Sequence, residues 1–120
     1  MSTEPTKELV TFPNPRIGRE YTISIDTDEF TALCPVTGQP DFATINLDYI
    51  PDKLCVELKS LKLYFWSYRN EGAFHEDVTN RICDDITDAL SPLYIKVTGD
   101  FNIRGGVHTV VTVEKDFRNK

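Results

Sequence analysis

A cysteine and an aspartate flank a short Pro/Gly turn, and these residue types suit addition to a polarised multiple bond. Cys34 begins the segment Cys-Pro-Val-Thr-Gly-Gln-Pro-Asp, and Asp41 ends it. Cysteine is the most nucleophilic ordinary side chain, and a nearby carboxylic acid can deliver the proton that an attacked C≡N, C=N or C=O group takes up. The segment therefore predicts an active-site loop. It also fits a plain tight turn with a buried Cys and a turn-capping Asp.

A second candidate is the segment Glu-Leu-Lys-Ser-Leu-Lys-Leu-Tyr at residues 57–64. Lys59 and Lys62 share one face of a predicted helix near its N-terminus, where lysines and open N–H groups favour an anion such as phosphate. Glu57 would enter this helix as a solvated or capping carboxylate. The alternative is an amphipathic helix with ordinary surface lysines.

A third candidate is the pair His75-Glu76, just before or at the start of a second predicted helix. A carboxylate can accept hydrogen bonds from the ring N–H and amino groups of a heterocycle, so the pair suits the polar edge of such a ligand. The alternative is a surface helix start. His108 lies in a predicted strand and is expected to be structural. The aromatic residues 64–68 have a spacing that suits core and subunit contacts.

The composition limits the classes of partner. With 13 Lys and Arg against 19 Asp and Glu, the formal charge of −6 argues against nucleic acid and anionic membrane surfaces. The apolar runs are too short to span a bilayer, and the N-terminus lacks the pattern of a secretory signal. The 3 cysteines show no CxxC spacing, which favours a reducing compartment over a disulfide framework. We expect a soluble, cytoplasmic protein.

The hydrophobic periodicity predicts strand, strand, helix, helix, strand, strand in one domain at residues 20–120, after an extended N-terminal arm at 1–19. The predicted strands cover 21–26, 42–50, 93–98 and 107–113, and the predicted helices cover about 58–70 and 78–90. The links favour an α+β fold, an antiparallel four-stranded sheet with two helices on one face. Its two edges would be unpaired in a monomer, so we expect an oligomer.

Together, the three candidate segments resemble the NADPH-dependent nitrile reductases that convert 7-cyano-7-deazaguanine to 7-aminomethyl-7-deazaguanine in queuosine biosynthesis, in their short, single-module form. Residues 57–64 match the family motif E-(S/L)-K-(S/A)-hydrophobic-K-(L/Y)-aromatic at every position. The resemblance implies a tunnelling fold (T-fold), in which ββααββ units assemble into a barrel. It further implies active sites between subunits and a homodecamer of two stacked pentamers.

The resemblance also implies residue roles. Cys34 would form a covalent thioimide with the nitrile, which two NADPH would reduce through an imine to the amine. Asp41 would donate protons, with help from His75. The implied substrate-binding residues are Val56, Glu57, Leu58, His75 and Glu76, and the implied NADPH-binding residues are Lys59, Ser60, Leu61 and Lys62. No glycine-rich dinucleotide fingerprint is present, so cofactor binding would be of a non-Rossmann kind, and no metal is expected.

Two alternatives from other classes remain at this point. Guanosine triphosphate cyclohydrolases and pterin enzymes share the implied fold, and a zinc site made by His75 with Cys34, Cys55 or Cys83 would favour them. The chain has only 2 histidines, however, and it lacks a Cys-Glu-His-His type of ligand run. The other alternative is a non-catalytic module that captures a purine-like ligand. The group that activates the Cys34 thiol is not visible in the sequence.

Overall fold

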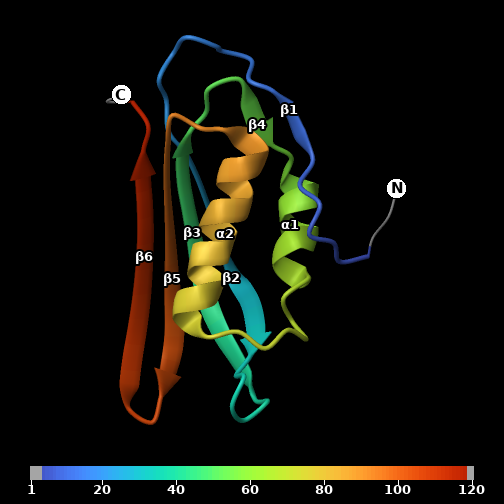
Figure 1. Ribbon diagram of the computed structural model, residues 1–120, viewed down its shortest axis with the longest axis vertical. Coiled ribbons are helices and arrows are strands. Elements are labelled where there is room, and N and C mark those ends of the chain that lie inside the picture. Colours follow the sequence, from blue (N-terminus) through green and yellow to red (C-terminus); the bar gives the residue numbers. More distant parts are fainter. Residues whose placement is uncertain (1–3, 119–120) are drawn as a thin grey trace.

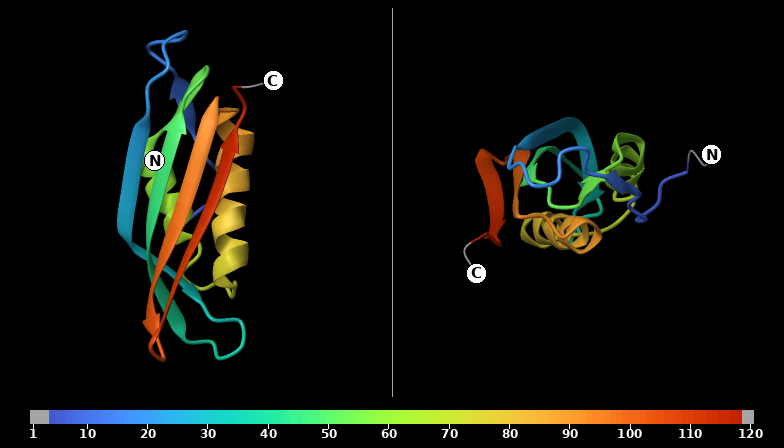
Figure 2. Two further views of the ribbon diagram at one scale, coloured as in Figure 1. Left: turned by 90° about the vertical axis from the view of Figure 1, so that its left-hand side faces the viewer. Right: turned by 90° about the horizontal axis from the view of Figure 1, so that it is seen from above.

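The computed structural model describes residues 4–118 and has an antiparallel four-stranded sheet with strand order β2-β3-β5-β6. The strands are β2 Ile23–Leu33, β3 Pro40–Ile50, β5 Tyr94–Arg104 and β6 Val107–Asp116. The helices are α1 Leu58–Trp66 and α2 His75–Leu90. Both helices lie on the same face of the sheet (Figures 1 and 2). The predicted α+β order of elements is confirmed.

A small second sheet was not predicted. It pairs β1 (Thr11–Pro13) with β4 (Leu54–Val56) in antiparallel register. β1 lies within the predicted arm at 1–19, whose first three residues fall outside the described part. The Ser60 hydroxyl also holds this arm, because it accepts from the N–H of Val10 at 2.7 Å and lies 3.2 Å from the carbonyl of Glu8, to which it donates. Strands this short carry no readable period.

The first main strand continues to Leu33, beyond its predicted end at Asp26. Its register shifts between Thr27 and Phe30, which marks a β-bulge. The bulge moves the inward-facing positions by one residue, so that Phe30 is buried where strict alternation would have placed its neighbour. The period-two pattern breaks at this point. The extension matters because it carries the chain directly to Cys34.

The last two strands are also longer than predicted. The sequence indicated a turn over 102–106, but β5 runs to Arg104 and β6 begins at Val107, so the turn consists of Gly105 and Gly106. Both glycines have positive φ, at 57° and 78°, as a two-residue hairpin turn with the twist of its strands requires. Arg104 therefore stands at the end of a strand.

The helices differ from prediction at their ends. α1 stops at Trp66, four residues before its predicted end, and the chain continues in turns held by bonds such as Tyr68 N–H to the carbonyl of Phe65. α2 begins at His75. Of the two predicted places for this residue, just before the helix or at its start, the second is confirmed. It ends at Ser91, whose φ of 45° is left-handed, directly before Pro92.

The core lies between the sheet and the two helices. Its fully buried apolar side chains include Ile45, Leu47, Ile95, Val97, Val78, Ile82 and Ile86. Burying each large aliphatic side chain contributes about 1.5–3 kcal/mol, so this layer fixes α2 against β3 and β5. Tyr64 joins the helices to each other by donating to Asp85 at 2.6 Å. No helix within residues 4–118 is long and apolar enough to cross a membrane.

Candidate active site

The hairpin between β2 and β3 holds Cys34 in a fixed backbone geometry. The Cys34 N–H donates to the carbonyl of Gln39, and the Gly38 N–H donates to the carbonyl of Cys34, both at 2.8 Å. Gly38 has a φ of 74°, a left-handed conformation that glycine adopts without steric cost. Cys34 is only half-buried, whereas the other two cysteines, Cys55 and Cys83, are buried free thiols. Cys34 is thus the accessible thiol of the described chain.

The turn itself supplies hydrogen bonds to the Cys34 sulfur. The Thr37 side chain donates to the Cys34 sulfur, as do the backbone N–H groups of Thr37 and Val36, and these bonds lower the pKa of Cys34. Partial burial and the nearby Asp41 carboxylate act in the opposite direction, but they do not outweigh the hydrogen bonds. A lowered pKa increases the thiolate fraction, which is the nucleophilic form. Thr37 is therefore a candidate site residue that the sequence did not identify.

A backbone connection brings this hairpin to the start of α2. The Leu33 N–H donates to the carbonyl of Glu71 at 2.9 Å, and the Ala73 N–H donates to the carbonyl of Leu33 at 3.0 Å. These bonds form a parallel bridge between Leu33 and Gly72. The residue just before Cys34 is therefore tied to the segment just before His75. Two candidate segments that lie far apart in the sequence meet here.

The His75 ring is held by a buried aromatic side chain. It stacks on Phe101 with ring centroids 3.9 Å apart and an interplanar angle of 8°. Phe101 in turn lies against Gly99, where an added Cβ would be only 2.8 Å from the Phe101 ring and 2.7 Å from the Thr79 hydroxyl oxygen. That hydroxyl donates to the His75 carbonyl at 2.8 Å. Gly99 thus leaves room for the two groups that orient His75.

Asp41 stands between two basic side chains. The carboxyl group is nearly buried, with 9% of the side chain exposed. One oxygen, Oδ2, lies 3.4 Å from Nε2 of His75, and the other, Oδ1, accepts from the guanidinium of Arg104. Arg104 comes from the end of β5, on the far side of β3 from Cys34. From the sequence, Arg104 was predicted only as part of a turn.

These side chains line one cavity of about 370 Å³. Its lining contains Cys34, Pro35, Thr37, Asp41, Ala73, Phe74, His75, Glu76 and Arg104. Glu76 is exposed in the first turn of α2, and the Phe74 ring is 57% exposed. The cavity therefore combines an accessible thiol, a carboxyl group with a neighbouring imidazole, an exposed carboxylate and an accessible aromatic face. This arrangement suits addition of the thiol to a flat, nitrogen-rich substrate with proton delivery to the attacked group.

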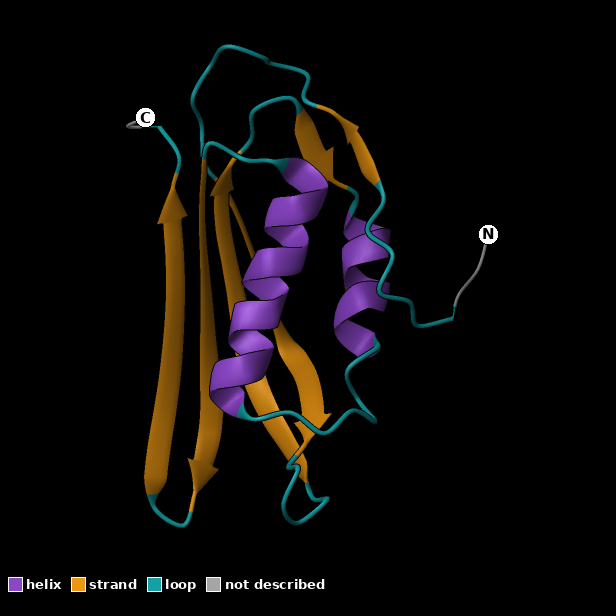
Figure 3. Cartoon of the chain, in the orientation of Figure 1, coloured by secondary structure: helices purple, strands orange, loops and turns teal. Residues whose placement is uncertain are grey.

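The other predicted substrate residues lie elsewhere in the chain. Val56, Glu57 and Leu58 lie where β4 leads into α1, well away from the β2–β3 hairpin (Figure 3). The Glu57 carboxylate caps α1, because it accepts from the N–H of Lys59 at 2.5 Å and of Ser60 at 3.3 Å. Val56 is buried, whereas Leu58 is 65% exposed. One chain therefore does not bring these three residues to the Cys34 cavity.

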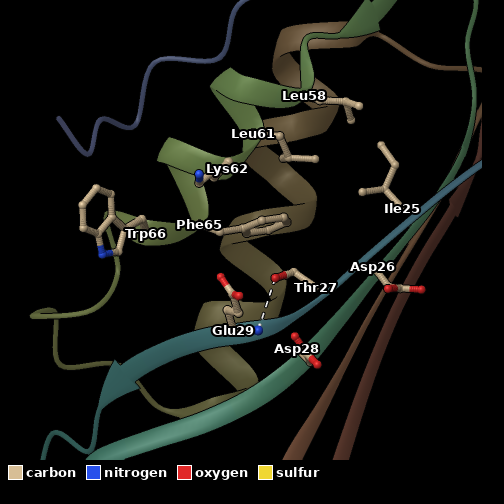
Figure 4. Close-up of a pocket in the computed structure, with 10 residues that line it drawn as sticks. All are labelled: Ile25, Asp26, Thr27, Asp28, Glu29, Leu58, Leu61, Lys62, Phe65 and Trp66. Carbon is tan, nitrogen blue, oxygen red and sulfur yellow. Dashed lines mark hydrogen bonds between the residues drawn. The ribbon is translucent and has the colours of Figure 1, made fainter. Parts of the chain in front are cut away.

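The predicted cofactor residues follow in the first two turns of α1. Ser60 and Leu61 are buried, so Lys59 and Lys62 present the accessible charges. Lys62 faces a groove of about 740 Å³ between α1 and the bulged part of β2 (Figure 4). The groove is lined by Leu58, Leu61, Lys62, Phe65 and Trp66 from α1 and by Ile25, Asp26, Thr27, Asp28 and Glu29 from β2. The two lysines suit phosphate, whereas the acidic rim from β2 does not.

The candidate ligands for a zinc site do not converge. Cys34 and His75 share one cavity, but Cys55 lies in β4 and Cys83 lies in the middle of α2. Within residues 4–118, no group of three or more His, Cys, Asp or Glu side chains has a spacing that could hold a metal ion. The arrangement of these side chains therefore gives no support to the cyclohydrolase alternative.

Comparison with known proteins gives a consistent result. A family model described as QueF-like protein matches residues 40–120. The NADPH-dependent 7-cyano-7-deazaguanine reductase of Anaeromyxobacter sp. (strain K) is 64% identical over 112 residues, covering 93% of this chain and 92% of that protein. Proteins with the same name are 60% identical in Alkalilimnicola ehrlichii, covering 95% and 88%, and 62% identical in Thermomicrobium roseum, covering 93% and 88%.

A solved structure supports the fold independently. The crystal structure of the archaeosine synthase QueF-Like in the apo form superposes with a TM-score of 0.74, covering 80% of this chain and 93% of that chain at 24% sequence identity. At this identity the likeness shows the fold alone, and it confirms the predicted tunnelling-fold topology. The family model and the curated relatives carry the assignment further: the chain belongs to the QueF-like family of NADPH-dependent 7-cyano-7-deazaguanine reductases.

Proposed function

We propose that this chain reduces the nitrile of 7-cyano-7-deazaguanine to the primary amine of 7-aminomethyl-7-deazaguanine, through a covalent thioimide on Cys34, in queuosine biosynthesis. Its family makes it an oxidoreductase that depends on NADPH. The observation that carries the mechanism is the shared cavity in which a thiol of lowered pKa meets Asp41 and His75. A nitrile is a poor hydride acceptor, whereas a protonated thioimide is a much better one.

The proposed first step uses groups that the cavity already places together. The Cys34 sulfur adds to the nitrile carbon, a C–S bond forms, one π bond of the nitrile breaks, and the nitrogen takes up a proton. Asp41 delivers that proton. Nε2 of His75 lies 3.4 Å from Oδ2 of Asp41 and helps to hold the carboxyl group in place. Glu76 is free to accept hydrogen bonds from the ring N–H and amino groups of the substrate, and the exposed ring of Phe74 offers it an apolar face.

NADPH supplies the hydride for each of the two successive two-electron reductions. Between them, the carbon–sulfur bond breaks, Cys34 leaves as a thiolate and the product of this stage is an imine. Asp41 and His75 supply the protons that the substrate nitrogen gains. Lys59 and Lys62 are the proposed partners of the cofactor phosphates, whereas the buried Ser60 and Leu61 contribute by shaping α1.

We propose that the complete site forms between copies of this chain. The residues assigned to the ring and the cofactor at 56–62 do not line the Cys34 cavity of the same chain, so a second copy would bring its own α1 to the cavity. Within residues 4–118, the outer edges of β2 and β6 have no strand partner, which leaves both edges open for side-by-side association. A decamer of two stacked pentamers is the proposed assembly.

The Cys34→Ala substitution tests the covalent step. We expect wild-type protein, incubated with the nitrile and no NADPH, to gain the mass of one substrate per chain, and we expect the variant to gain none. Intact mass spectrometry measures this directly. The matched control is Cys83→Ala, which removes a fully buried thiol and should leave the adduct intact. An adduct that persists in Cys34→Ala would disprove the assignment of the nucleophile.

The Thr37→Val substitution tests how the thiol is activated. Because the Thr37 hydroxyl lowers the pKa of Cys34, its removal should raise that pKa. The pH at which iodoacetamide alkylates Cys34 at half its maximal rate should then move to higher pH in the absence of substrate. Thr37→Ser keeps a hydroxyl and should behave like wild type. An unchanged alkylation profile in Thr37→Val would show that the turn does not activate Cys34.

A mixing experiment tests the shared site. Cys34→Ala and Lys62→Glu chains should each be nearly inactive alone. After the two are dissociated, mixed equally and reassembled, random pairing should restore about a quarter of the sites, since each site takes Cys34 from one copy and Lys62 from another. NADPH oxidation measures the recovery. No recovery in assemblies shown to contain both chains would mean that one chain holds the entire site.

A further inference from the structure

Arg104 makes the most concentrated set of polar contacts in the Cys34 cavity, and no role has been given to it above. Its guanidinium donates to the Asp41 carboxylate, to the Pro40 carbonyl at 3.1 Å and to the Gln39 side-chain oxygen at 2.6 Å. All three acceptors belong to the segment that leads from the Cys34 turn into β3. The planar fork of arginine suits such a set of acceptors, whereas the single ammonium of lysine does not.

The position of Arg104 fits a task at the site better than a task in the core. Its side chain is 40% exposed, so it adds little to packing, and it stands at the last position of β5 before the Gly105-Gly106 turn. The other titratable or charged side chains that line this cavity are Cys34, His75, Glu76 and Arg104. Arg104 is the only one of these with a permanent positive charge, and its guanidinium pairs directly with the Asp41 carboxylate.

We propose that Arg104 is a positioning residue for the proton transfer, because it holds Asp41 as a carboxylate aimed at the reacting nitrogen. This proposal rests on the function proposed above. An ionised Asp41 has no proton of its own to give. The proton that reaches the nitrile nitrogen therefore begins on the Cys34 thiol, and Asp41 relays it.

This relay balances without any further reactant. The S–H bond of Cys34 breaks and its proton moves to an oxygen of Asp41, while the sulfur electron pair forms the new C–S bond. One π bond of the nitrile breaks, its electron pair moves to nitrogen, and the nitrogen takes the proton from Asp41. Asp41 ends as it began, a carboxylate paired with Arg104. The step involves no net oxidation or reduction, so it can be observed without NADPH.

Formation of the adduct in the absence of NADPH is the measurement that tests the relay. We would compare wild type with Arg104→Gln and Arg104→Lys, following the rate of adduct formation by intact mass and, separately, the KM for NADPH. Arg104→Gln should form the adduct roughly tenfold to a hundredfold more slowly, since a misplaced catalytic group costs rates of this order. Arg104→Lys keeps the positive charge but loses the planar guanidinium, so its rate of adduct formation should lie between that of wild type and that of Arg104→Gln.

A matched control separates this effect from a general loss of surface ion pairs. Arg118 also pairs with carboxylates, those of Asp116 and Glu20, and its side chain is similarly exposed at 34%. Arg118→Gln should therefore leave the rate of adduct formation unchanged. Circular dichroism and size-exclusion chromatography would establish that each variant is folded and assembled.

Two outcomes would overturn the proposal. If Arg104→Gln forms the adduct at the wild-type rate but has a raised KM for NADPH, Arg104 binds the cofactor and does not position Asp41. If Arg104→Gln does not fold, Arg104→Lys is the variant that tests the proposal. A wild-type rate of adduct formation in Arg104→Lys, together with a raised KM for NADPH, would contradict the proposal in the same way. Failure of wild type itself to form an adduct would instead contradict the proposed function.

Discussion

The site depends on one short backbone connection, the pair of hydrogen bonds that joins Leu33 to the segment 71–73. Glu71, at the start of that segment, is fixed in turn by ion pairs with Lys7 and Arg81, both at 2.7 Å. Burial raises the pKa of Glu71, but the bonds from these two cations outweigh it and lower the pKa. The ionised carboxylate thus holds the N-terminal arm, the connecting segment and α2 together.

The candidate site residues fall into two groups that lie in different parts of the molecule. The end of the sheet near the β2–β3 hairpin carries the candidate catalytic groups: Cys34 follows β2, Asp41 lies in β3, Arg104 ends β5 and His75 begins α2. The motif at the start of α1 lies away from this cavity, and its Glu57 and Ser60 hold the helix and the N-terminal arm. The candidate catalytic residues and the proposed cofactor residues are therefore separated within one chain, and the proposed association of copies would bring them together.

Much of this was predictable from the sequence, because residue types at short spacing reveal local structure. Period-two and helical patterns located the four main strands and the two helices, and the two predicted candidate segments at Cys34 and His75 line one cavity. The bulge near Asp28, the length of β5 and the short strand β1 were not predicted, because each depends on pairing between distant segments. Arg104 was missed for the same reason, since only the register of β5 against β3 brings it to Asp41. Thr37 lay inside the identified loop, but the direction of its hydroxyl depends on the folded turn.

The central claim is that the Cys34 cavity carries a complete four-electron reduction of a nitrile. Absorbance at the nicotinamide band, followed with limiting 7-cyano-7-deazaguanine and excess NADPH, tests it most directly. The account predicts that two NADPH are oxidised for each nitrile consumed, with none oxidised when the nitrile is left out. One NADPH per nitrile would mean that the reaction stops at the imine, and no oxidation at all would contradict the account.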